Sequence, residues 1–149
     1  MSTREDTHPL RAVIDRYNDA WNRHDVDAIV ALHAPAMVFE NHTAGERVEG
    51  AGVRAHVAGI FEAWPDLRFR TRRLYVRDDL VVQEWTASAT HSRPLHRGDL
   101  VAPPTGRLLE WEGLDVIPFE DGLVLRKDVY SDSVAILRAT GLLETPALA

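Results

Sequence analysis

Asp115 is the acidic residue whose surroundings in the sequence most strongly indicate chemistry. It lies in a run where every second residue, including Trp111 and Ile117, is expected on one face of a strand. An unpaired charge beside such neighbours is costly to bury. We therefore expect Asp115 to be protonated or to have a partner, and a carboxyl with a raised pKa suits a general acid or an oxyanion donor. An edge position facing water is the alternative.

His91 ends a second alternating run. Alternation places Trp85 and His91 on one face, with Ala87 and Ala89 between them, which leaves room for a bound molecule. In the alternative interpretation, Trp85 is a core residue beside small packing partners and His91 accepts a backbone contact in a loop. The residues alone leave both interpretations open.

Asp132 follows the last expected strand. A carboxylate there can move a proton in a pocket, or it can cap the helix expected next. Simple alternation places Arg126, Asp128 and Tyr130 on the face of Asp132. A pocket floor of that polarity requires an ion pair between Arg126 and Asp128, or a bulge in the strand.

The composition restricts the kinds of protein this chain can be. Its 149 residues are 45% hydrophobic and 27% charged, which predicts one globular domain over residues 1–149. A net charge of -6 argues against a nucleic-acid partner, because phosphate binding needs clustered cations. A local basic run is nevertheless present: Arg68, Arg70, Arg72, Arg73 and Arg77. The absence of cysteine excludes disulfides and thiol catalysis.

Neither a metal site nor a membrane segment is expected. The histidines show no His-x-His or His-x-x-x-His spacing, and no phosphate loop or nucleophile elbow occurs. The first residues lack the apolar core of a signal peptide, and no apolar run approaches the roughly 18 residues of a membrane span. We expect a cytoplasmic protein that uses no cofactor.

Three helical segments are expected first. The first begins at Pro9 and carries Tyr17 and Trp21 on its apolar stripe. Asp25 is a good N-cap for the second, which Pro35 is expected to end. The third has an apolar stripe from Val53 to Trp64.

Alternation replaces the helical period from Leu67 onward. Strands are predicted over 67–76, 80–91, 107–119 and 123–130, with a hairpin at Glu120-Asp121-Gly122 and a short helix over 131–140. Helices followed by an antiparallel meander predict an α+β fold. A curved sheet covered by helices on one face leaves a mostly apolar cavity.

The stretch from Arg16 to His42 resembles the opening of the nuclear transport factor 2-like superfamily, which includes ketosteroid isomerases and SnoaL-like polyketide cyclases. The resemblance implies a cone-shaped barrel: a strongly curved, mostly antiparallel sheet, three helices from the N-terminal half over its concave face, and a short C-terminal helix. Tyr17 matches the isomerases' oxyanion-hole tyrosine, and Asp115 resembles their protonated oxyanion-hole aspartate. Their proton-shuttling aspartate corresponds to Asn41, an amide that cannot take a proton at neutral pH.

The second half resembles a SnoaL-like polyketide cyclase in the order of short motifs. These are Glu84-Trp85, Ala89-Thr90-His91, Pro104-Thr105-Gly106-Arg107, Phe119-Glu120-Asp121-Gly122 and Tyr130-Ser131-Asp132. Together with the N-terminal match, the resemblance covers the chain from about Leu10 to Gly141. It implies that Asp132 is the general acid/base of an intramolecular aldol closure and that His91 helps polarise the substrate.

The prediction is a cofactor-independent acid/base enzyme for a small hydrophobic carbonyl compound, acting as a polyketide cyclase or an isomerase. The candidate catalytic residues are Asp132, His91, Asp115 and Tyr17. The candidate substrate-binding residues are Trp21, Phe39, Asn41, Trp64, Trp85 and Tyr130. The resemblance also implies a homodimer that forms through the outer face of the sheet.

Two alternative functions stay open. The first is a non-catalytic protein that binds a small apolar ligand. The second is an epoxide hydrolase of the limonene type, because Arg97-Gly98-Asp99 resembles that enzyme's arginine and acid. Its water-activating aspartate corresponds to Val129, with Asp128 next to it on the opposite face.

Overall fold

The computed structural model describes residues 7–144. Its helices are α1 (Pro9–Asn22), α2 (Val26–Ala31), α3 (Gly52–Ala63) and α4 (Ser133–Ala139). The strands of the first half are β1 (His33–Asn41), β2 (Glu46–Glu49) and β3 (Arg68–Arg77). Those that follow are β4 (Leu80–Thr90), β5 (Leu95–Arg97), β6 (Leu100–Ala102), β7 (Leu108–Glu120) and β8 (Leu123–Ser131).

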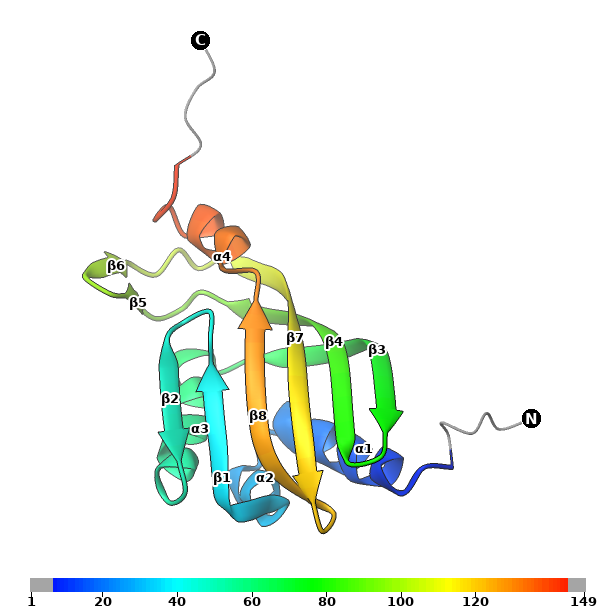
Figure 1. Cartoon of the computed structure of the whole chain (residues 1–149). Coiled ribbons are helices and arrows are strands. Elements are labelled where there is room, and N and C mark those ends of the chain that lie inside the picture. The colour runs from blue at the N-terminus through cyan, green and yellow to red at the C-terminus, as the bar shows by residue number, and fades with distance from the viewer. Residues whose placement is uncertain (1–6, 145–149) are drawn as a thin grey trace.

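Six strands form one curved sheet in the order β2-β1-β8-β7-β4-β3. The neighbouring strands are antiparallel except β1 and β8, which run parallel. Helices α1, α2 and α3 lie against one side of the sheet, and α4 lies at one end (Figure 1). The predicted α+β fold is therefore confirmed. The sheet does not close into a barrel, because β2 and β3 remain edge strands and the cone stays open.

Local signals in the sequence formed the expected turns and caps. The side chain of Asp25 accepts a 3.0 Å hydrogen bond from the amide of Ala28 and so caps α2. Asp121 and Gly122, between β7 and β8, both have positive φ, at 52° and 75°. Two central residues of that kind give the hairpin turn whose twist matches the flanking strands.

The structure differs from the prediction around Pro35. The second helix ends at Ala31, and Pro35 lies inside β1 instead of ending the helix. The pairing of β1 with β8 shifts register between His33 and Val38, and a proline is tolerated at such an irregularity because no amide donor is needed there. The short strands β2, β5 and β6 fall in segments where no strand was predicted, since three or four residues are too few to show a period.

Trp85 lies flat across the neighbouring strand because that strand has a glycine opposite it. Trp85 on β4 pairs with Gly113 on β7. A Cβ atom at Gly113 would lie 2.2 Å from the six-membered ring of the indole. The missing side chain on β7 therefore sets the orientation of a large aromatic residue at the centre of the sheet.

Candidate functional site

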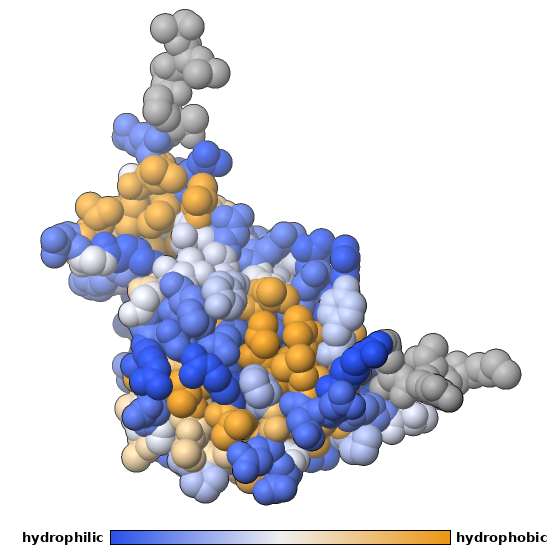
Figure 2. Space-filling model, in the orientation of Figure 1, coloured by the Kyte–Doolittle hydropathy of each residue, from blue (hydrophilic) through white to orange (hydrophobic). Residues whose placement is uncertain are grey.

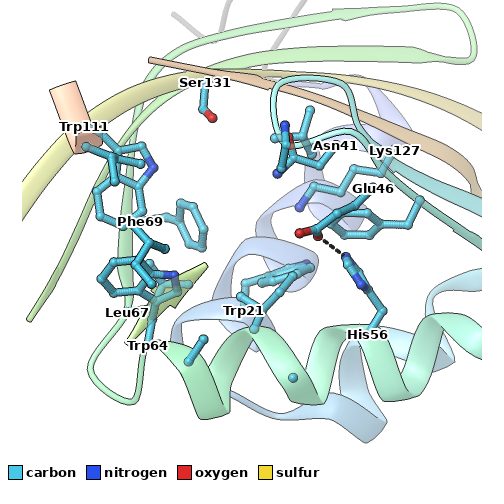
Figure 3. Close-up of a pocket in the computed structure, with 18 of the residues that line it drawn as sticks. Trp21, Asn41, Glu46, His56, Trp64, Leu67, Phe69, Trp111, Lys127 and Ser131 are labelled. Atoms are coloured by element: carbon cyan, nitrogen blue, oxygen red, sulfur yellow. Dashed lines mark hydrogen bonds and ion pairs between the residues drawn. The ribbon is translucent and has the colours of Figure 1, made fainter. Parts of the chain in front are cut away.

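A cavity of about 510 Å³ lies between the helices and the sheet (Figure 3). All four tryptophans of the chain line it: Trp21, Trp64, Trp85 and Trp111. Phe39, Phe69 and Asn41 also contribute to the walls. Five of the six residues predicted to bind substrate therefore lie on the lining, and their role in binding stays a prediction.

Asp115 and Lys127 form a buried ion pair on the sheet side of the cavity. The two residues are 2% and 6% exposed. Lys127 Nζ lies 3.7 Å from Asp115 Oδ2, and the side-chain amide of Gln83 donates a 3.0 Å hydrogen bond to the same oxygen. Of the alternatives considered for Asp115, the structure shows the one with a partner, and its burial excludes an edge position. Asp115 Oδ1 has no hydrogen-bond partner among residues 7–144.

Aromatic rings surround the amine of Lys127. Its nitrogen lies 4.0 Å from the centre of the Trp21 ring, and 5.4 Å and 5.5 Å from those of Tyr17 and Phe39. The faces of these rings attract the ammonium ion. Burial nevertheless lowers the pKa of Lys127, and the attraction to Asp115 offsets only part of this effect.

A second titratable pair enters the cavity from other elements. His56 projects from α3 and Glu46 from β2, with 3.6 Å between His56 Nε2 and Glu46 Oε2 (Figure 3). Sequence reasoning missed Glu46, His56 and Lys127. Lys127 could have been found, because it shares one face of its strand with Val129 and is the only lysine in the chain.

Tyr17 is fully buried but does not belong to the cavity lining. Its hydroxyl lies 2.8 Å from His33 Nε2, and burial raises the pKa of Tyr17. The hydroxyl is thus engaged within the core, between α1 and β1. The oxyanion role suggested for Tyr17 stays a prediction that needs a rearrangement to reach a ligand.

His91 also lies outside the lining, although its ring centre is 6.1 Å from that of Trp64, which lines the cavity. The backbone amide of Thr105 donates a 3.2 Å hydrogen bond to His91 Nδ1. In the neutral imidazole, the proton is therefore on Nε2, and that atom is buried without a partner among residues 7–144. The backbone contact considered for His91 is present, and its catalytic role stays a prediction.

Asp132 is exposed and lies outside the cavity, contrary to its predicted position. Its side chain accepts a 3.1 Å hydrogen bond from the amide of Ala135 and caps α4. The reason is the phase of β8. Lys127, Val129 and Ser131 line the cavity, so the alternate residues face the other side of the sheet.

Tyr130 also belongs to the outer face, so its predicted position in the cavity is wrong. It is 47% exposed, and its ring stacks on that of His42 with 4.5 Å between the ring centres. Together with Asp132 it borders a shallow depression on the outside of the sheet. Tyr130 is therefore not placed to bind a molecule in the cavity.

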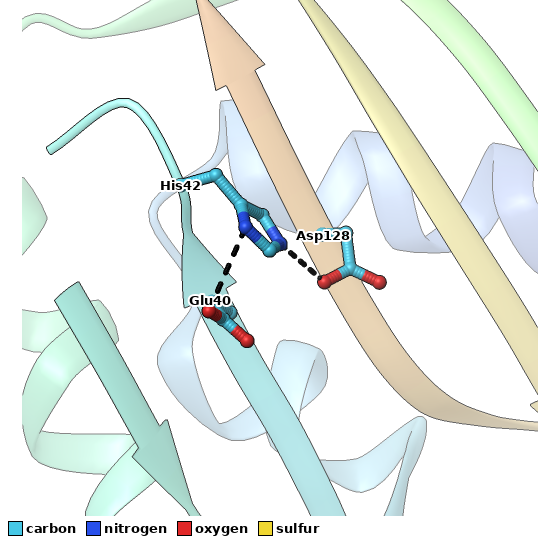
Figure 4. Close-up of side chains that lie close together, drawn as sticks. All are labelled: Glu40, His42 and Asp128. Atoms are coloured by element: carbon cyan, nitrogen blue, oxygen red, sulfur yellow. Dashed lines mark hydrogen bonds and ion pairs between the residues drawn. The ribbon is translucent and has the colours of Figure 1, made fainter. Parts of the chain in front are cut away.

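Glu40, His42 and Asp128 form a cluster on the outer face, where β1 lies beside β8 (Figure 4). His42 Nε2 lies 2.7 Å from Asp128 Oδ1, and Nδ1 lies 3.6 Å from Glu40 Oε2. Possible metal-ligand atoms of the three residues lie within 4.8 Å of one another, a proximity that motif spacing could not reveal because it forms across strands.

Arg126 neutralises the two carboxylates of this cluster. It donates hydrogen bonds of 2.9 Å and 2.8 Å to Asp128 and a further one to Glu40. Burial alone raises the pKa of Asp128, but the hydrogen bonds from Arg126 and His42 outweigh it and lower the pKa below its ordinary value. The cluster is thus an ion-pair network that joins β1 to β8. The ion pair between Arg126 and Asp128, one of the two conditions considered for a polar pocket floor, exists on the outer face.

Residues 14–127 match the family model of the SnoaL-like domain, which is more than half of the chain. The chain belongs to the SnoaL-like family. The fold agrees with this match. Membership of the SnoaL-like family places the chain among small-molecule cyclases or isomerases. No curated protein matches the chain.

Solved structures of similar fold cover nearly the whole SnoaL-like chain. AclR, a proposed hydroxylase from Streptomyces galilaeus, is 24% identical with a TM-score of 0.78, over 91% of this chain and 87% of AclR. A proposed SnoaL-like polyketide cyclase from Jannaschia sp. CCS1 is 20% identical with a TM-score of 0.79, over 93% and 99%. IdmH, a proposed polyketide cyclase from Streptomyces antibioticus, is 25% identical with a TM-score of 0.74, over 90% and 99%.

The residues suggested for epoxide hydrolysis do not come together in this SnoaL-like structure. Arg97 and Val129 line the cavity, whereas Asp128 is held by Arg126 and His42 on the outer face. An apolar side chain therefore occupies the position of the water-activating acid.

None of the helices within residues 7–144 combines the length and apolar character needed to cross a membrane.

Proposed function

We propose that this protein binds a small hydrophobic carbonyl compound in its cavity and converts it by acid/base chemistry of its own side chains, as a cyclase or an isomerase. One observation carries the proposal: a 510 Å³ cavity, lined by all four tryptophans, receives two titratable pairs from four different elements. Mostly apolar cavities with a few convergent polar groups are typical sites for small molecules.

In this proposal Asp115 carries the proton and Lys127 stabilises negative charge. Asp115 Oδ1 has no hydrogen-bond donor among residues 7–144 and can accept a proton. The nearby amine of Lys127 can neutralise an enolate oxygen that forms when a carbon beside the carbonyl loses its proton. His56, next to Glu46, supplies a second acid/base group, because an imidazole can accept a proton on one nitrogen and donate one from the other. No step requires a bound cofactor.

The first test uses tryptophan fluorescence, which reports on the cavity because every tryptophan lines it. We expect some polycyclic or polyketide-like ketones to quench the fluorescence in a saturable manner, and some of these to be converted to cyclised or isomerised products. Binding without conversion of any of them would favour the non-catalytic alternative. The absence of any fluorescence response across the panel would contradict the proposal.

The second test separates Asp115 from Asp132. With a converted ketone in hand, Asp115→Asn should lower kcat by about 100-fold or more, because an amide cannot take a proton, while binding persists. Asp132→Asn should retain turnover, since an asparagine still caps α4 and the position lies outside the cavity. The opposite pattern would show that Asp132 is the general acid/base, as the family resemblance suggested.

The outer face of the sheet is the proposed contact of a homodimer. Hydrophobic residues gather at its centre over β7 and β8, with hydrophilic residues around them (Figure 2). Tyr75 and Tyr130 are 50% and 47% exposed.

The cytoplasmic location expected from the sequence stays a prediction.

A further inference from the structure

The single lysine of this chain lies in its cavity. Lys127 is the one lysine among 17 lysines and arginines, so every other strongly basic side chain is a guanidinium. A guanidinium keeps its proton in proteins and does not act as an amine nucleophile, whereas an ammonium can lose its proton when it is buried. The only side-chain amine that the sequence offers is therefore placed beside the site of the proposed chemistry.

The surroundings of Lys127 suit an amine that reacts in its neutral form. Its side chain is 7% exposed and belongs to the cavity lining, and it extends from β8 toward the interior (Figure 3). The titratable groups that face it are Asp115 from β7, Tyr17 from α1 and His33 from β1. Burial lowers the pKa of Lys127, which raises the fraction of the neutral, nucleophilic amine.

We propose that Lys127 forms an imine with the carbonyl carbon of the substrate, which places the substrate among aldehydes and ketones with an apolar body that packs against the tryptophans. This inference rests on the proposed function, because it requires a carbonyl compound in the cavity. It goes further by making Lys127 a covalent catalyst instead of a fixed positive charge.

The atoms balance without an oxidant or a reductant. The neutral Nζ attacks the carbonyl carbon, a C–N bond forms, and a proton passes from nitrogen to oxygen. Loss of that oxygen as water breaks the C–O bond and leaves the C=N bond, so that amine and carbonyl give imine and water. Asp115, with Oδ2 3.7 Å from the amine and Oδ1 unpartnered among residues 7–144, is placed to carry these protons.

The imine would make the next step easier. A protonated imine withdraws electrons from the adjacent carbon more strongly than the parent carbonyl does, so a proton on that carbon is removed more readily. Asp115 can accept that proton, and the resulting enamine can form a new C–C bond or be reprotonated elsewhere. Water then hydrolyses the imine and returns Lys127 to its amine form.

The test is reductive trapping on the full chain with 2-naphthaldehyde and sodium cyanoborohydride. Mass spectrometry of a chymotryptic digest should show one naphthylmethyl group on Lys127. The α-amino group of the chain can also react, and its label is measured separately because it lies on a different peptide. Labelling should saturate with aldehyde concentration and run at least about tenfold faster than in the urea-unfolded chain, because the cavity holds the aldehyde beside the amine and burial raises the neutral fraction of the amine.

Arg70→Lys supplies a matched control within one molecule. Residue 70 is exposed on β3, so a lysine there lacks the cavity that holds the aldehyde beside Lys127 and should be labelled at least about tenfold more slowly. Lys127→Arg keeps the positive charge but cannot form an imine, and it should give no adduct at that position and lose turnover. If that variant does not fold, an excess of 2-methylnaphthalene, which has the same apolar body but no carbonyl, should compete for the cavity and protect Lys127 of the unaltered protein.

Tryptophan fluorescence separates the two ways in which the inference can fail. If 2-naphthaldehyde quenches the fluorescence but Lys127 is labelled no faster than the lysine at position 70, the imine is wrong and the proposed function stands. If Lys127→Arg folds and keeps full turnover, the imine is likewise wrong. If neither this aldehyde nor any ketone of the panel binds, the proposed function and the imine fail together.

Discussion

His33 shows how one buried titratable residue couples this protein's stability to pH. Burial, together with the charge of Lys127, lowers the pKa of His33 from its ordinary value of 6.5 to about 4. As the pH falls below 6.5, the unfolded chain therefore takes up a proton that the folded chain does not. Stability is fully present above pH 6.5 and declines toward pH 4, by at most about 3 kcal/mol.

Replacing His33 tests this coupling. His33→Gln keeps a polar side chain that can still bond the Tyr17 hydroxyl, but it removes the titration. The free energy of unfolding in urea, measured between pH 4 and 7.5, should fall less steeply with decreasing pH in the variant than in the unaltered protein. Equal slopes in the two proteins would contradict the lowered pKa of His33.

Asp132 illustrates how a residue's place decides its role. Asp132→Ala should lower the free energy of unfolding by about 1 kcal/mol, because the amide of Ala135 loses its capping acceptor. Asp132→Asn should change it little, since asparagine caps nearly as well. Thermal and urea unfolding of both variants measure this difference, and similar losses in the two would argue against capping as the main role.

Among the elements, the contact between β4 and β7 depends on one missing side chain. Gly113→Ala should lower the free energy of unfolding by about 2 kcal/mol or more, because its Cβ would lie 2.2 Å from the Trp85 indole and force the ring or the strand to move. The fluorescence of the folded variant should change as well, since Trp85 borders the cavity.

Gly59 provides the matched control for that substitution. It lies within α3, and a Cβ there would meet nothing within 4 Å. Gly59→Ala should raise the free energy of unfolding by about 0.5–1 kcal/mol, because alanine loses less backbone entropy in a helix. Urea unfolding of the two variants should therefore shift in opposite directions, and a shift in the same direction would contradict the packing argument.

Strand β8 shows why an element can be predicted correctly and its face wrongly. Both of its faces carry charged residues, with Lys127 toward the cavity and Arg126 and Asp128 in the ion-pair network on the other side. A shift of one residue in the assignment exchanges the two faces. Val129 beside Lys127 was the one indication of the phase in the strand's own pattern. The phase is decided by how β1 and β7 pair with β8.

The whole molecule presents a sheet with one side covered by helices and the other open (Figure 1). If the open side is the contact of a homodimer, light scattering after size exclusion should give twice the mass of the chain. Leu114→Glu, at the centre of that face and paired with Tyr130, should shift the protein to a monomer by placing a charge in the contact. A dimer that persists in Leu114→Glu would place the contact elsewhere.

Leu100→Glu is the control for the dimer. Leu100 is 54% exposed in β6, which belongs to the separate β5–β6 hairpin. A charge there leaves the outer face of the six-stranded sheet unchanged, so the mass should stay that of the dimer. Loss of the dimer in this variant as well would show that the outer face is not the specific contact.

Local patterns were sufficient for the helices, the long strands from Leu67 onward and the family. The helical period around Tyr17, the cap at Asp25 and the turn at Asp121-Gly122 act over a few residues, so each can be recognised without knowing its neighbours in space. The apolar walls could also be anticipated, because Trp21, Phe39 and Trp64 lie on stripes that had to face a common interior.

The chemistry of the site depended on contacts between distant parts of the chain. Asp115 meets Lys127 because β7 and β8 pair in one register, and Glu46 meets His56 because a short strand lies beside a helix. Register and helix docking arise from the packing of the whole sheet, and no local period encodes them. For the same reason Asp132 lies outside the cavity, while the one lysine of the chain lies inside it.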